Sequence, residues 1–441
     1  MSFRNLRRRL GLLGTWCAVV CCAAMGLCGC KSVPDPIEDI IDDDHHMNTT
    51  DKTNGGASYV GSGACKSCHP QVGAWHELHG HGNILTPTLG QPPQFPSEAE
   101  GAGVPDPPAG FDWSDISWVI GGYTKRASFA GLDGYLLTNG VDGVDSQWNL
   151  DFLPNGTAAG FVEYEPSQVT PKPYDFSCFQ CHTTAPAAQD PGFPEFEENR
   201  PGFVGTWGEA GVMCESCHGP GSNHFNSVED RALVDPTKIF VDVTGTKSCF
   251  ECHNRPFDSR NGKILAGGGY IKNQEQYPEL KASGGHSEFA CTFCHSPHRS
   301  VFYDRAGAIR NDCTDCHSSQ NMALHEGKVF ARDGYVEALR CESCHMTYAT
   351  RSASVGGVDV VGAMGRMGDT QTHIFRISTE DVGYEGMFTA DGSEVIRDGA
   401  GRAKVTVDFV CLRCHNEATD NPFALTIEFA SEIAIGMHGG S

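Results

Sequence analysis

The pattern of hydrophobic and polar positions predicts short elements separated by long irregular connections. A continuous apolar run extends from Leu10 to Gly29 near the N-terminus. Between Ile116 and Tyr164, apolar stretches punctuated by glycine predict a few β-strands, with a turn at residues 132–135. Because these strands are few and short, they indicate a small β insertion in a chain that is otherwise not strand-rich.

The second half of the chain has two weaker patterns. Alternation in the sequence KVTVDF at residues 404–409 predicts a strand pair around Met387–Phe409. Residues Asn421–Ile435 have helical periodicity, and His438 follows that stretch. We therefore expect one strand pair and one terminal helix in this region.

Two segments have no periodicity and are predicted to be connections. Residues 30–58 are acidic, contain proline and glycine and are poor in aromatic side chains, which is typical of a flexible tether. Residues 84–110 contain seven prolines, which favour an extended connection.

The N-terminal apolar run is predicted to be an export signal. It follows a basic start at Arg4, Arg7, Arg8 and Arg9. The sequence that ends it, Leu-Cys-Gly-Cys, resembles a bacterial lipobox, and the resemblance implies cleavage after residue 29 and a lipid on Cys30. An uncleaved transmembrane anchor is the alternative, because about 20 apolar residues suffice to span a bilayer. Either way the body of the protein is expected outside the cytoplasm, as a membrane-anchored lipoprotein facing the periplasm or the cell exterior.

Charge and cysteine content narrow the class of function. The 441 residues include 55 Asp plus Glu, 32 Lys plus Arg and 21 Cys. Nucleic acid is not expected as a partner, because phosphate backbones are bound through a surplus of basic side chains. So many cysteines in an exported chain indicate disulfides, bound metal or a covalently linked cofactor.

Sixteen cysteines remain after the leader, and all of them occur in pairs of the form Cys-x-x-Cys-His. The eight motifs are CKSCH at Cys65, Cys68 and His69; CFQCH at Cys178, Cys181 and His182; CESCH at Cys214, Cys217 and His218; CFECH at Cys249, Cys252 and His253; CTFCH at Cys291, Cys294 and His295; CTDCH at Cys313, Cys316 and His317; CESCH at Cys341, Cys344 and His345; and CLRCH at Cys411, Cys414 and His415.

This spacing predicts covalently attached haem c. Two residues between the thiols allow both thioethers to form on one turn, and the following histidine then becomes the proximal iron ligand. Zinc ribbons and disulfides are the alternatives, but neither requires histidine as the next residue. Histidine occupies only 19 of 441 positions, so its presence after all eight pairs favours eight haems.

The density of motifs predicts the class of fold. Six motifs lie between Cys178 and His345, a span of 168 residues, or 28 per motif. We expect a mainly α protein with much irregular structure, a haem-dominated core and small β insertions. The expected divisions are a signal peptide at 1–29, a tether at 30–58, a first haem region with the β insertion at 59–175, a haem-dense core at 176–350 and a C-terminal haem region at 351–441.

Eleven further histidines are candidates for the sixth iron ligand. His45 and His46 lie in the tether and are expected to be surface residues. Six others lie in or beside the motif-dense sequence and are predicted to be distal ligands: His224, His286, His298, His325, His373 and His438.

The remaining three candidates, His76, His79 and His81, lie within six residues of one another. Complete bis-histidine coordination of eight haems needs two of these three, and His81 is the first choice and His79 the second. If only one serves, one haem takes methionine, takes a histidine from another subunit, or stays five-coordinate and binds small molecules.

Several stretches resemble a known family. Residues 59–70, with Trp75 and the His-Gly-His at 79–81, look like the opening of the cytochrome c-554 type of multihaem cytochrome. Residues 214–224 are also similar, and this resemblance implies that His224 is a distal ligand. Residues 116–123 and Gly368-Asp369 with His373 are similar to larger relatives, some of which polymerise into extracellular conductive filaments. Members of the family transfer electrons, and at least one of their haems can lack a distal ligand.

The leading functional hypothesis is therefore an exported octahaem cytochrome that passes electrons along closely packed, mostly bis-histidine haems. Redox partner proteins or extracellular electron acceptors are its expected partners. One alternative is an octahaem reductase of a nitrogen or sulfur compound with one open haem. A subunit of an extracellular cytochrome filament, or another homo-oligomer, is the third hypothesis.

Overall fold

The computed structural model describes residues 48–150, 159–225, 235–255, 262–332, 335–352, 360–361, 365–416 and 421–438. The predicted signal, Cys30, His45 and His46 lie outside these residues. The chain after His46 clusters as one compact unit. Among the described residues, no helix has both the length and the apolar character needed to cross a bilayer.

The helices are short, and half of the α-helices in the described residues contain residues of one motif each. Helices that contain motif residues are α2 (Ser62–Cys68), α5 (Phe176–Phe179), α6 (Cys214–His218), α8 (Thr246–Phe250), α10 (Cys291–Cys294), α12 (Cys313–Cys316) and α13 (Cys341–His345), and α14 (Val407–Val410) leads into Cys411. The others are α3 (Pro70–Glu77), α4 (Asn139–Asp142), α7 (Ser222–Phe225), α9 (Gln276–Lys281), α11 (Arg305–Ala308) and α15 (Ile427–Gly436). Short 3-10 helices are η2 (Trp113–Asp115), η3 (Glu197–Asn199), η5 (Pro236–Lys238), η6 (Ala323–His325) and η7 (Tyr384–Met387).

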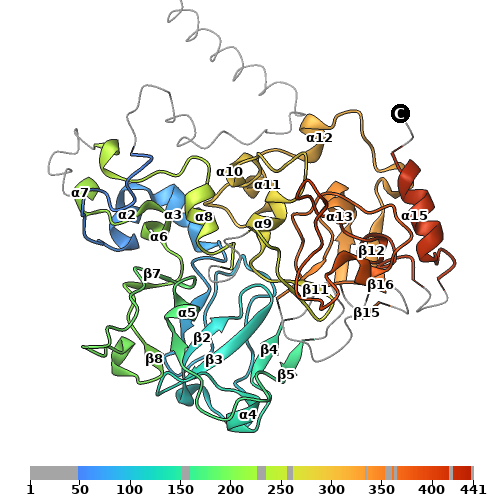
Figure 1. Ribbon diagram of the computed structural model, residues 1–441. Coiled ribbons are helices and arrows are strands. Elements are labelled where there is room, and N and C mark those ends of the chain that lie inside the picture. The colour runs from blue at the N-terminus through green and yellow to red at the C-terminus, as the bar shows by residue number, and fades with distance from the viewer. Residues whose placement is uncertain are drawn as a thin grey trace, which may run out of the picture. The chain divides into compact units, whose positions relative to one another are not determined.

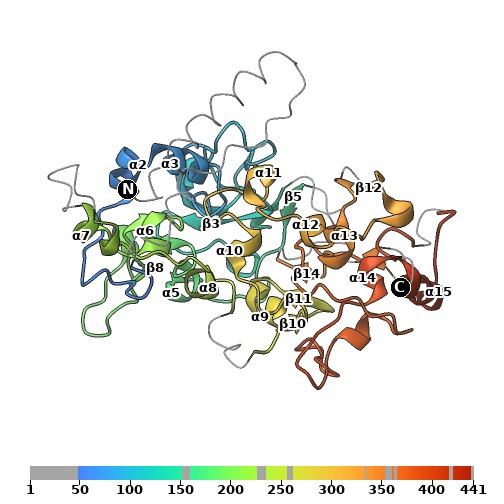
Figure 2. The ribbon, with the colours of Figure 1, turned by 90° about the horizontal axis from the view of Figure 1, so that it is seen from above.

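The motif helices follow one another across the molecule. In both ribbon views α2, α6 and α8 lie at one side, α10 lies in the middle, and α12 and α13 lie beyond it, with α15 at the far side (Figures 1 and 2). The β insertion lies below this row in Figure 1. The motifs are therefore arranged as a row rather than around one central core.

A five-stranded antiparallel sheet lies between the first and second motifs. Its order is β1 (Leu85–Pro87), β2 (Ile116–Gly121), β3 (Arg126–Gly131), β4 (Gln147–Asn149) and β5 (Gly160–Val162). Four of its strands lie in the predicted β insertion, and β1 lies in residues 84–110, which were predicted to be a connection. Val119 pairs with Phe129 in the β2–β3 register and faces one apolar cluster, while Trp118 and Ala130 face another. This alternation covers both faces of the sheet, and the second cluster extends to the second motif.

The remaining strands are short and connect neighbouring motifs. They are β6 (Tyr174–Asp175) with β8 (Phe203–Val204), β7 (Thr183–Thr184) with β9 (Glu209–Ala210), β10 (Ala266–Gly267) with β11 (Tyr270–Lys272) and β14 (Thr350–Arg351), β12 (Val329–Arg332) with β13 (Tyr335–Ala338), and β15 (Val360–Val361) with β16 (Gly365–Arg366).

The predicted strand pair around Met387–Phe409 is wrong. The described residues of this region form only isolated bridges: Ile377 to Val405, Phe388 to Val395 and Leu265 to Glu394. Val407–Val410 forms α14, whose four residues are all buried. A short helix fully buried against its neighbours shows no polar face, so its sequence looked like that of a strand. The predicted terminal helix is confirmed as α15, which Thr426 caps by accepting a hydrogen bond from the amide of Phe429.

Part of the predicted tether packs against the third motif. Asn54 is buried, and its side-chain amide donates to the carbonyls of His218 and Pro220, each at 2.9 Å. Residues 48–58 therefore contact the body of the protein, since buried amide hydrogen bonds hold this segment in place.

Candidate functional site

None of the sixteen motif cysteines forms a disulfide in the structure. Among the described residues, no group of three or more His, Cys, Asp or Glu side chains is arranged to hold a metal ion. The disulfide and zinc alternatives therefore find no support in the described part of the chain.

Thiols of different motifs lie next to each other. Cys65 contacts Cys214, Cys181 contacts Cys252, and Cys249 contacts Cys291. Hydrogen bonds join other motifs: Ser248 donates to the carbonyl of Cys217 at 3.4 Å, and Arg413 donates to that of Ser343 at 3.0 Å. Groups attached to these cysteines would thus be close neighbours.

Six motif histidines face a second histidine ring at the separation that a shared iron requires. A metal–imidazole bond is about 2 Å, so two rings on opposite sides of one metal have centres about 6 Å apart. The observed ring-centre distances are 6.1 Å for His253–His81, His218–His298 and His295–His373, 5.9 Å for His317–His286 and His415–His325, and 5.7 Å for His345–His438. A seventh motif histidine, His69, has His224 close enough to lower its pKa, after the larger effect of burial.

Hydrogen bonds at Nδ1 leave the other ring nitrogen of several histidines available for a metal. Each of three motif histidines has its Nδ1 atom beside a backbone carbonyl oxygen. The distances are 2.8 Å for His218 and Phe240, 2.9 Å for His345 and Phe375, and 2.7 Å for His415 and Phe423. The same contact occurs at His224 (3.2 Å, Asp235) and His438 (3.0 Å, Asn321). A carbonyl only accepts, so Nδ1 carries the proton and Nε2 has its lone pair free. The residues present therefore fit haem iron with two axial imidazoles.

The second motif differs from the others. Nδ1 of His182 lies 2.9 Å from the hydroxyl of Tyr174, and the described residues place no second imidazole opposite this ring. Burial, and then the charge of Arg126, lower the pKa of His182 to about 4. His182 is thus a neutral imidazole with a nearby cation and without a distal histidine in the described part of the chain.

Arg126, the cation that acts on His182, lies at the start of β3, just after the turn between β2 and β3. Gly121 and Gly122 have φ values of 84° and 79°, and a Cβ on Gly121 would lie 2.2 Å from the Arg126 carbonyl, so the turn requires glycine. Lys125 forms a 3.8 Å ion pair with Asp369, and Arg126 donates to Gln147 at 3.1 Å. The turn therefore presents positive charge in a chain whose net charge is −23.

Of the three clustered histidines, the structure pairs only His81 with a motif histidine. His79 stacks on His81 at 4.4 Å, and its Nδ1 accepts the amide hydrogen of His81 at 3.1 Å. A neutral ring whose Nδ1 accepts carries its proton on Nε2, so this geometry does not support the expectation that His79 is a distal ligand. His76 Nε2 lies 3.1 Å from the Val212 carbonyl and is engaged as well.

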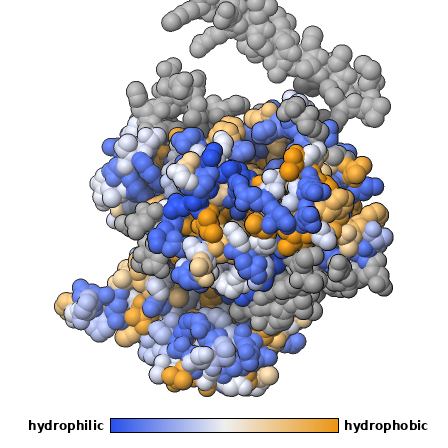
Figure 3. Space-filling model, turned by 45° about the vertical axis from the view of Figure 1, so that its right-hand side comes forward, coloured by the Kyte–Doolittle hydropathy of each residue, from blue (hydrophilic) through white to orange (hydrophobic). Residues whose placement is uncertain are grey.

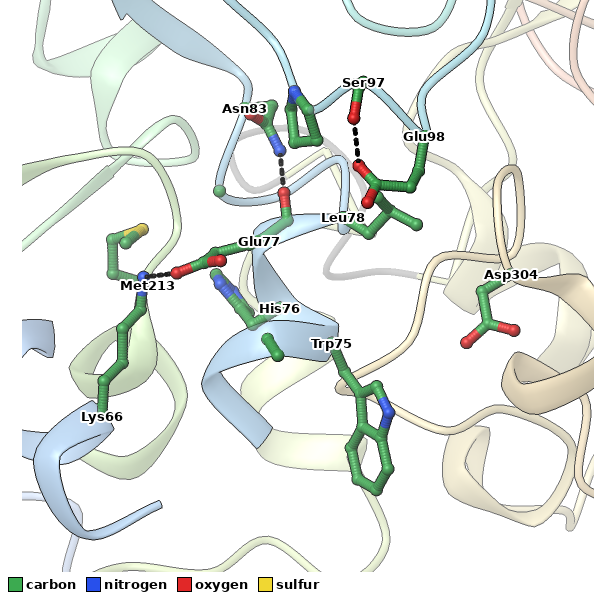
Figure 4. Close-up of a pocket in the computed structure, with 13 residues that line it drawn as sticks. Lys66, Trp75, His76, Glu77, Leu78, Asn83, Ser97, Glu98, Met213 and Asp304 are labelled. Atoms are coloured by element: carbon green, nitrogen blue, oxygen red, sulfur yellow. Dashed lines mark hydrogen bonds and ion pairs between the residues drawn. The ribbon is translucent and has the colours of Figure 1, made fainter. Parts of the chain in front are cut away.

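A cavity of ≈ 680 Å³ lies beside the last turn of α3 (Figure 4). Trp75, His76 and Leu78 of α3 line it, together with Glu98 and Asp304. Trp75 stacks on the guanidinium of Arg299 at 4.1 Å. No motif cysteine lines the cavity, but Lys66 of the first motif and Met213, directly before the third motif, do, so it adjoins these two attachment sites.

Several large apolar side chains near the later motifs are exposed. Leu324 is 88% exposed, Phe423 is 70% exposed and Val336 is 67% exposed. On the face drawn in Figure 3, hydrophobic residues lie at the surface between hydrophilic ones. An attached porphyrin beside the seventh and eighth motifs would cover apolar surface of this kind.

Comparison with known proteins agrees with these sites. The family described as cytochrome c554 and c-prime matches residues 162–219, which include the second and third motifs. The structure is similar to the octahaem sulfite reductase MccA of Wolinella succinogenes, with a TM-score of 0.51, 14% identity, and coverage of 89% of this chain and 73% of that one. The chain is thus similar to multihaem c-type cytochromes in sequence around the second and third motifs and in fold.

In sequence, the chain is 21% identical to the same reductase over 227 residues, which are 43% of the chain and 29% of that protein. It therefore spans less than a third of that relative's length. Weaker structural similarity links it to the outer cell wall cytochrome OcwA (TM-score 0.47, 16% identity, 86% of each chain). An undecahaem cytochrome from the S-layer of Carboxydothermus ferrireducens has a TM-score of 0.43, 18% identity, and coverage of 87% of this chain and 60% of that one.

Sequence reasoning missed three features of these sites. Tyr174 precedes the second motif by only four residues, but nothing in the sequence marks it as a partner of His182. Glu209 and Glu215 are buried or half-buried acceptors beside the first and third motifs. A glutamate inside a Cys-x-x-Cys unit is a detectable signal, but its partners depend on the tertiary structure.

Proposed function

We propose that this protein transfers electrons outside the cytoplasm through eight covalently attached haems, most of them held by two histidines. One observation carries the proposal: six motif histidines face a second histidine at 5.7–6.1 Å between ring centres, and His224 lies near a seventh. Two axial imidazoles keep haem iron low-spin and its potential low compared with histidine–methionine sites. Such haems carry electrons and bind no substrate.

The contacts between motifs support a branched order. Numbering each haem by its motif, haems 1, 3, 4, 5, 6, 7 and 8 form a single file. Cys65 beside Cys214 links haems 1 and 3, and Cys249 beside Cys291 links haems 4 and 5. Haems 3 and 4 are linked by the hydrogen bond from Ser248 to Cys217. The last three links, from haem 5 to haem 8, are Cys294 near Cys316, Cys313 near Cys341 and Cys344 near Cys411. Haem 2 joins the file at haem 4 through Cys181 and Cys252.

Charge restricts the partners. A net charge of −23 repels anionic proteins and favours basic redox partners or metal cations. Anchoring through a lipid on Cys30 and exchange with extracellular acceptors are parts of the same proposal.

The test is a count of haems combined with a spectrum of their iron. A pyridine haemochrome assay on purified protein should give eight haems per chain, and electron paramagnetic resonance should be dominated by low-spin ferric haem. A stoichiometry of one or two, or a mainly high-spin spectrum, would contradict the proposal.

A second function, reduction of a small oxyanion of sulfur or nitrogen at haem 2, is favoured by the surroundings of His182. It has no distal imidazole among the described residues, and Arg126 lies close to it. Positive charge attracts anions to a site that can bind them. Each oxygen removed from such an anion takes up two electrons, which the haem file would supply, and two protons, and leaves as water.

Carbon monoxide binding to the reduced protein separates the two functions. A reactive haem 2 predicts one carbon monoxide per chain, and sulfite or nitrite should perturb the same haem in the oxidised protein. The variant H45A/H46A tests whether the tether supplies its ligand. If the wild-type protein binds no carbon monoxide and the variant binds one per chain, a tether histidine is the distal ligand of haem 2. The reductase function is then rejected.

A further inference from the structure

The first and third motifs are joined by two carboxylates. Glu215, inside the third motif, is 2% exposed. Its two oxygens accept hydrogen bonds from the amides of Val60 (3.0 Å), Gly61 (2.8 Å) and Gly221 (2.7 Å). Glu209 accepts from the amide of Ser62 at 3.0 Å and from its hydroxyl at 2.8 Å.

These contacts connect both sides of the first haem site. Val60, Gly61 and Ser62 are the N-terminus of α2, which carries Cys65, Cys68 and His69. Gly221 immediately precedes α7, which carries His224. Glu215 therefore ties the start of α2, which leads to His69, to the segment that carries His224.

The bonding pattern also assigns the charge of Glu215. Both oxygens accept from N–H donors and neither donates, which fits the ionised carboxylate, whose oxygens are acceptors only. Hydrogen bonds from backbone amides stabilise the ionised form in a buried position. Among the described residues no cation forms an ion pair with Glu215 or Glu209. Both charges act on the thiol of Cys65, and that of Glu209 also acts on Cys214.

We propose that Glu215, with Glu209, is a positioning residue of haem 1: it holds His224 opposite His69 and places negative charge between haems 1 and 3. This inference rests on the proposed attachment of haem at both motifs. Removing the carboxylate should loosen the distal histidine and favour the reduced, less positively charged iron.

The test is the substitution E215Q in the full-length holoprotein, compared with E251Q. Glu251 also lies inside a motif, but its side chain is 55% exposed and pairs with Lys52 at the surface. E215Q should add a high-spin, carbon monoxide-binding haem to those of wild type. It should also favour reduction of one or two haems about tenfold, a shift of about 59 mV for one electron. E251Q should change neither, because solvent screens its charge. E215D, which keeps the charge, should keep the potentials nearer those of wild type than E215Q does.

Mass analysis of the haem peptides separates this inference from the proposed function. Full haem occupancy with E215Q indistinguishable from E251Q would overturn the positioning role. Selective loss of haem at the first motif would support it. Wild-type protein without haem at the first or third motif would instead contradict the proposed function. If E215Q does not fold, E209Q decides between the same outcomes, since Glu209 lies nearer the surface and bonds only to Ser62.

Discussion

Nε2 of His345 lies 3.4 Å from Nε2 of His438, although 93 residues separate them in the chain. Backbone carbonyls of Phe375 and Asn321 hold the two Nδ1 atoms, so both free lone pairs point into the same gap. His438 lies two residues after the end of α15, so this helix places its ring beside the gap. Two axial ligands of one iron have their nitrogens about 4 Å apart, so the two rings need to move apart only slightly to bind it.

Substituting His438 should therefore open haem 7. The variant H438A should convert one haem from low-spin to high-spin ferric iron and raise carbon monoxide binding by one per chain, because no other described histidine faces His345. Electron paramagnetic resonance and a carbon monoxide titration measure the two effects. H79A is the control, since the His79 ring faces His81 and His76. Equal spectra of H438A and wild type would exclude His438 as a ligand.

The sequence predicts the attachment sites but not their pairing. Each Cys-x-x-Cys-His unit is local, so spacing alone identifies it, and the helical periodicity before His438 predicts α15. Which histidine faces which motif depends on contacts between distant segments. His298 follows the fifth motif, which ends at His295, yet it faces His218 of the third motif. No local pattern distinguishes His298 from His79, whose tautomer depends on a neighbouring amide.

Errors in the predicted elements have the same origin. Val407–Val410 alternates like a strand, but burial on all sides and the motif that follows select a helix. Residues 48–58 have the composition of a linker, yet Asn54 packs against the carbonyls of the third motif. In both cases tertiary contacts override a weak local signal.

Tyr174 should tune the haem bound at the second motif. In Y174F the Nδ1–H of His182 loses its acceptor, so the imidazole donates less electron density to a bound iron and the potential should rise. One hydrogen bond is worth about 0.5–1.5 kcal/mol, which corresponds to about 20–60 mV for one electron. Spectroelectrochemistry of the carbon monoxide-reactive haem measures this shift. Y123F is the matched control, because Tyr123 is also buried and its hydroxyl donates to the Leu78 carbonyl instead of to a histidine ring. A similar shift in both variants would refute the effect.

Glu275 should make the stability of the protein depend on pH. Its pKa is raised from 4.5 to about 8. Burial is the largest cause and Glu279 adds to it, while the Leu265 amide, Arg255 and Lys272 act in the opposite direction. The folded state therefore keeps a proton that the unfolded state loses above its ordinary pKa. The stabilising contribution is complete below pH 4.5 and is lost as pH rises to about 8, by about 1.4 kcal/mol per pH unit at most.

The variant E275Q has no proton to lose and should remove this slope. Denaturant unfolding at several pH values between 5 and 8 should give a stability difference between variant and wild type that grows with pH. Glu251, exposed at the surface, provides the control E251Q, which should parallel wild type. A constant difference between E275Q and wild type over this range would show that Glu275 is ionised in the folded protein.

Arg413 should be one of the most sensitive positions outside the cysteines and histidines. Its side chain is 2% exposed, and its guanidinium binds Glu337 through two hydrogen bonds of 2.8 and 3.1 Å. The variant R413M leaves the Glu337 carboxylate buried without its partner, which should lower the free energy of unfolding by about 3–5 kcal/mol. The double variant R413M/E337Q should recover most of this loss, because no unpaired charge remains buried. K404M breaks an exposed pair with Glu380 and should cost about 1 kcal/mol or less. Denaturant unfolding of wild type and the three variants, all with full haem content, measures these differences. If the double variant is no more stable than R413M, the loss comes from packing of Arg413 against Phe330 and Tyr348 and not from charge.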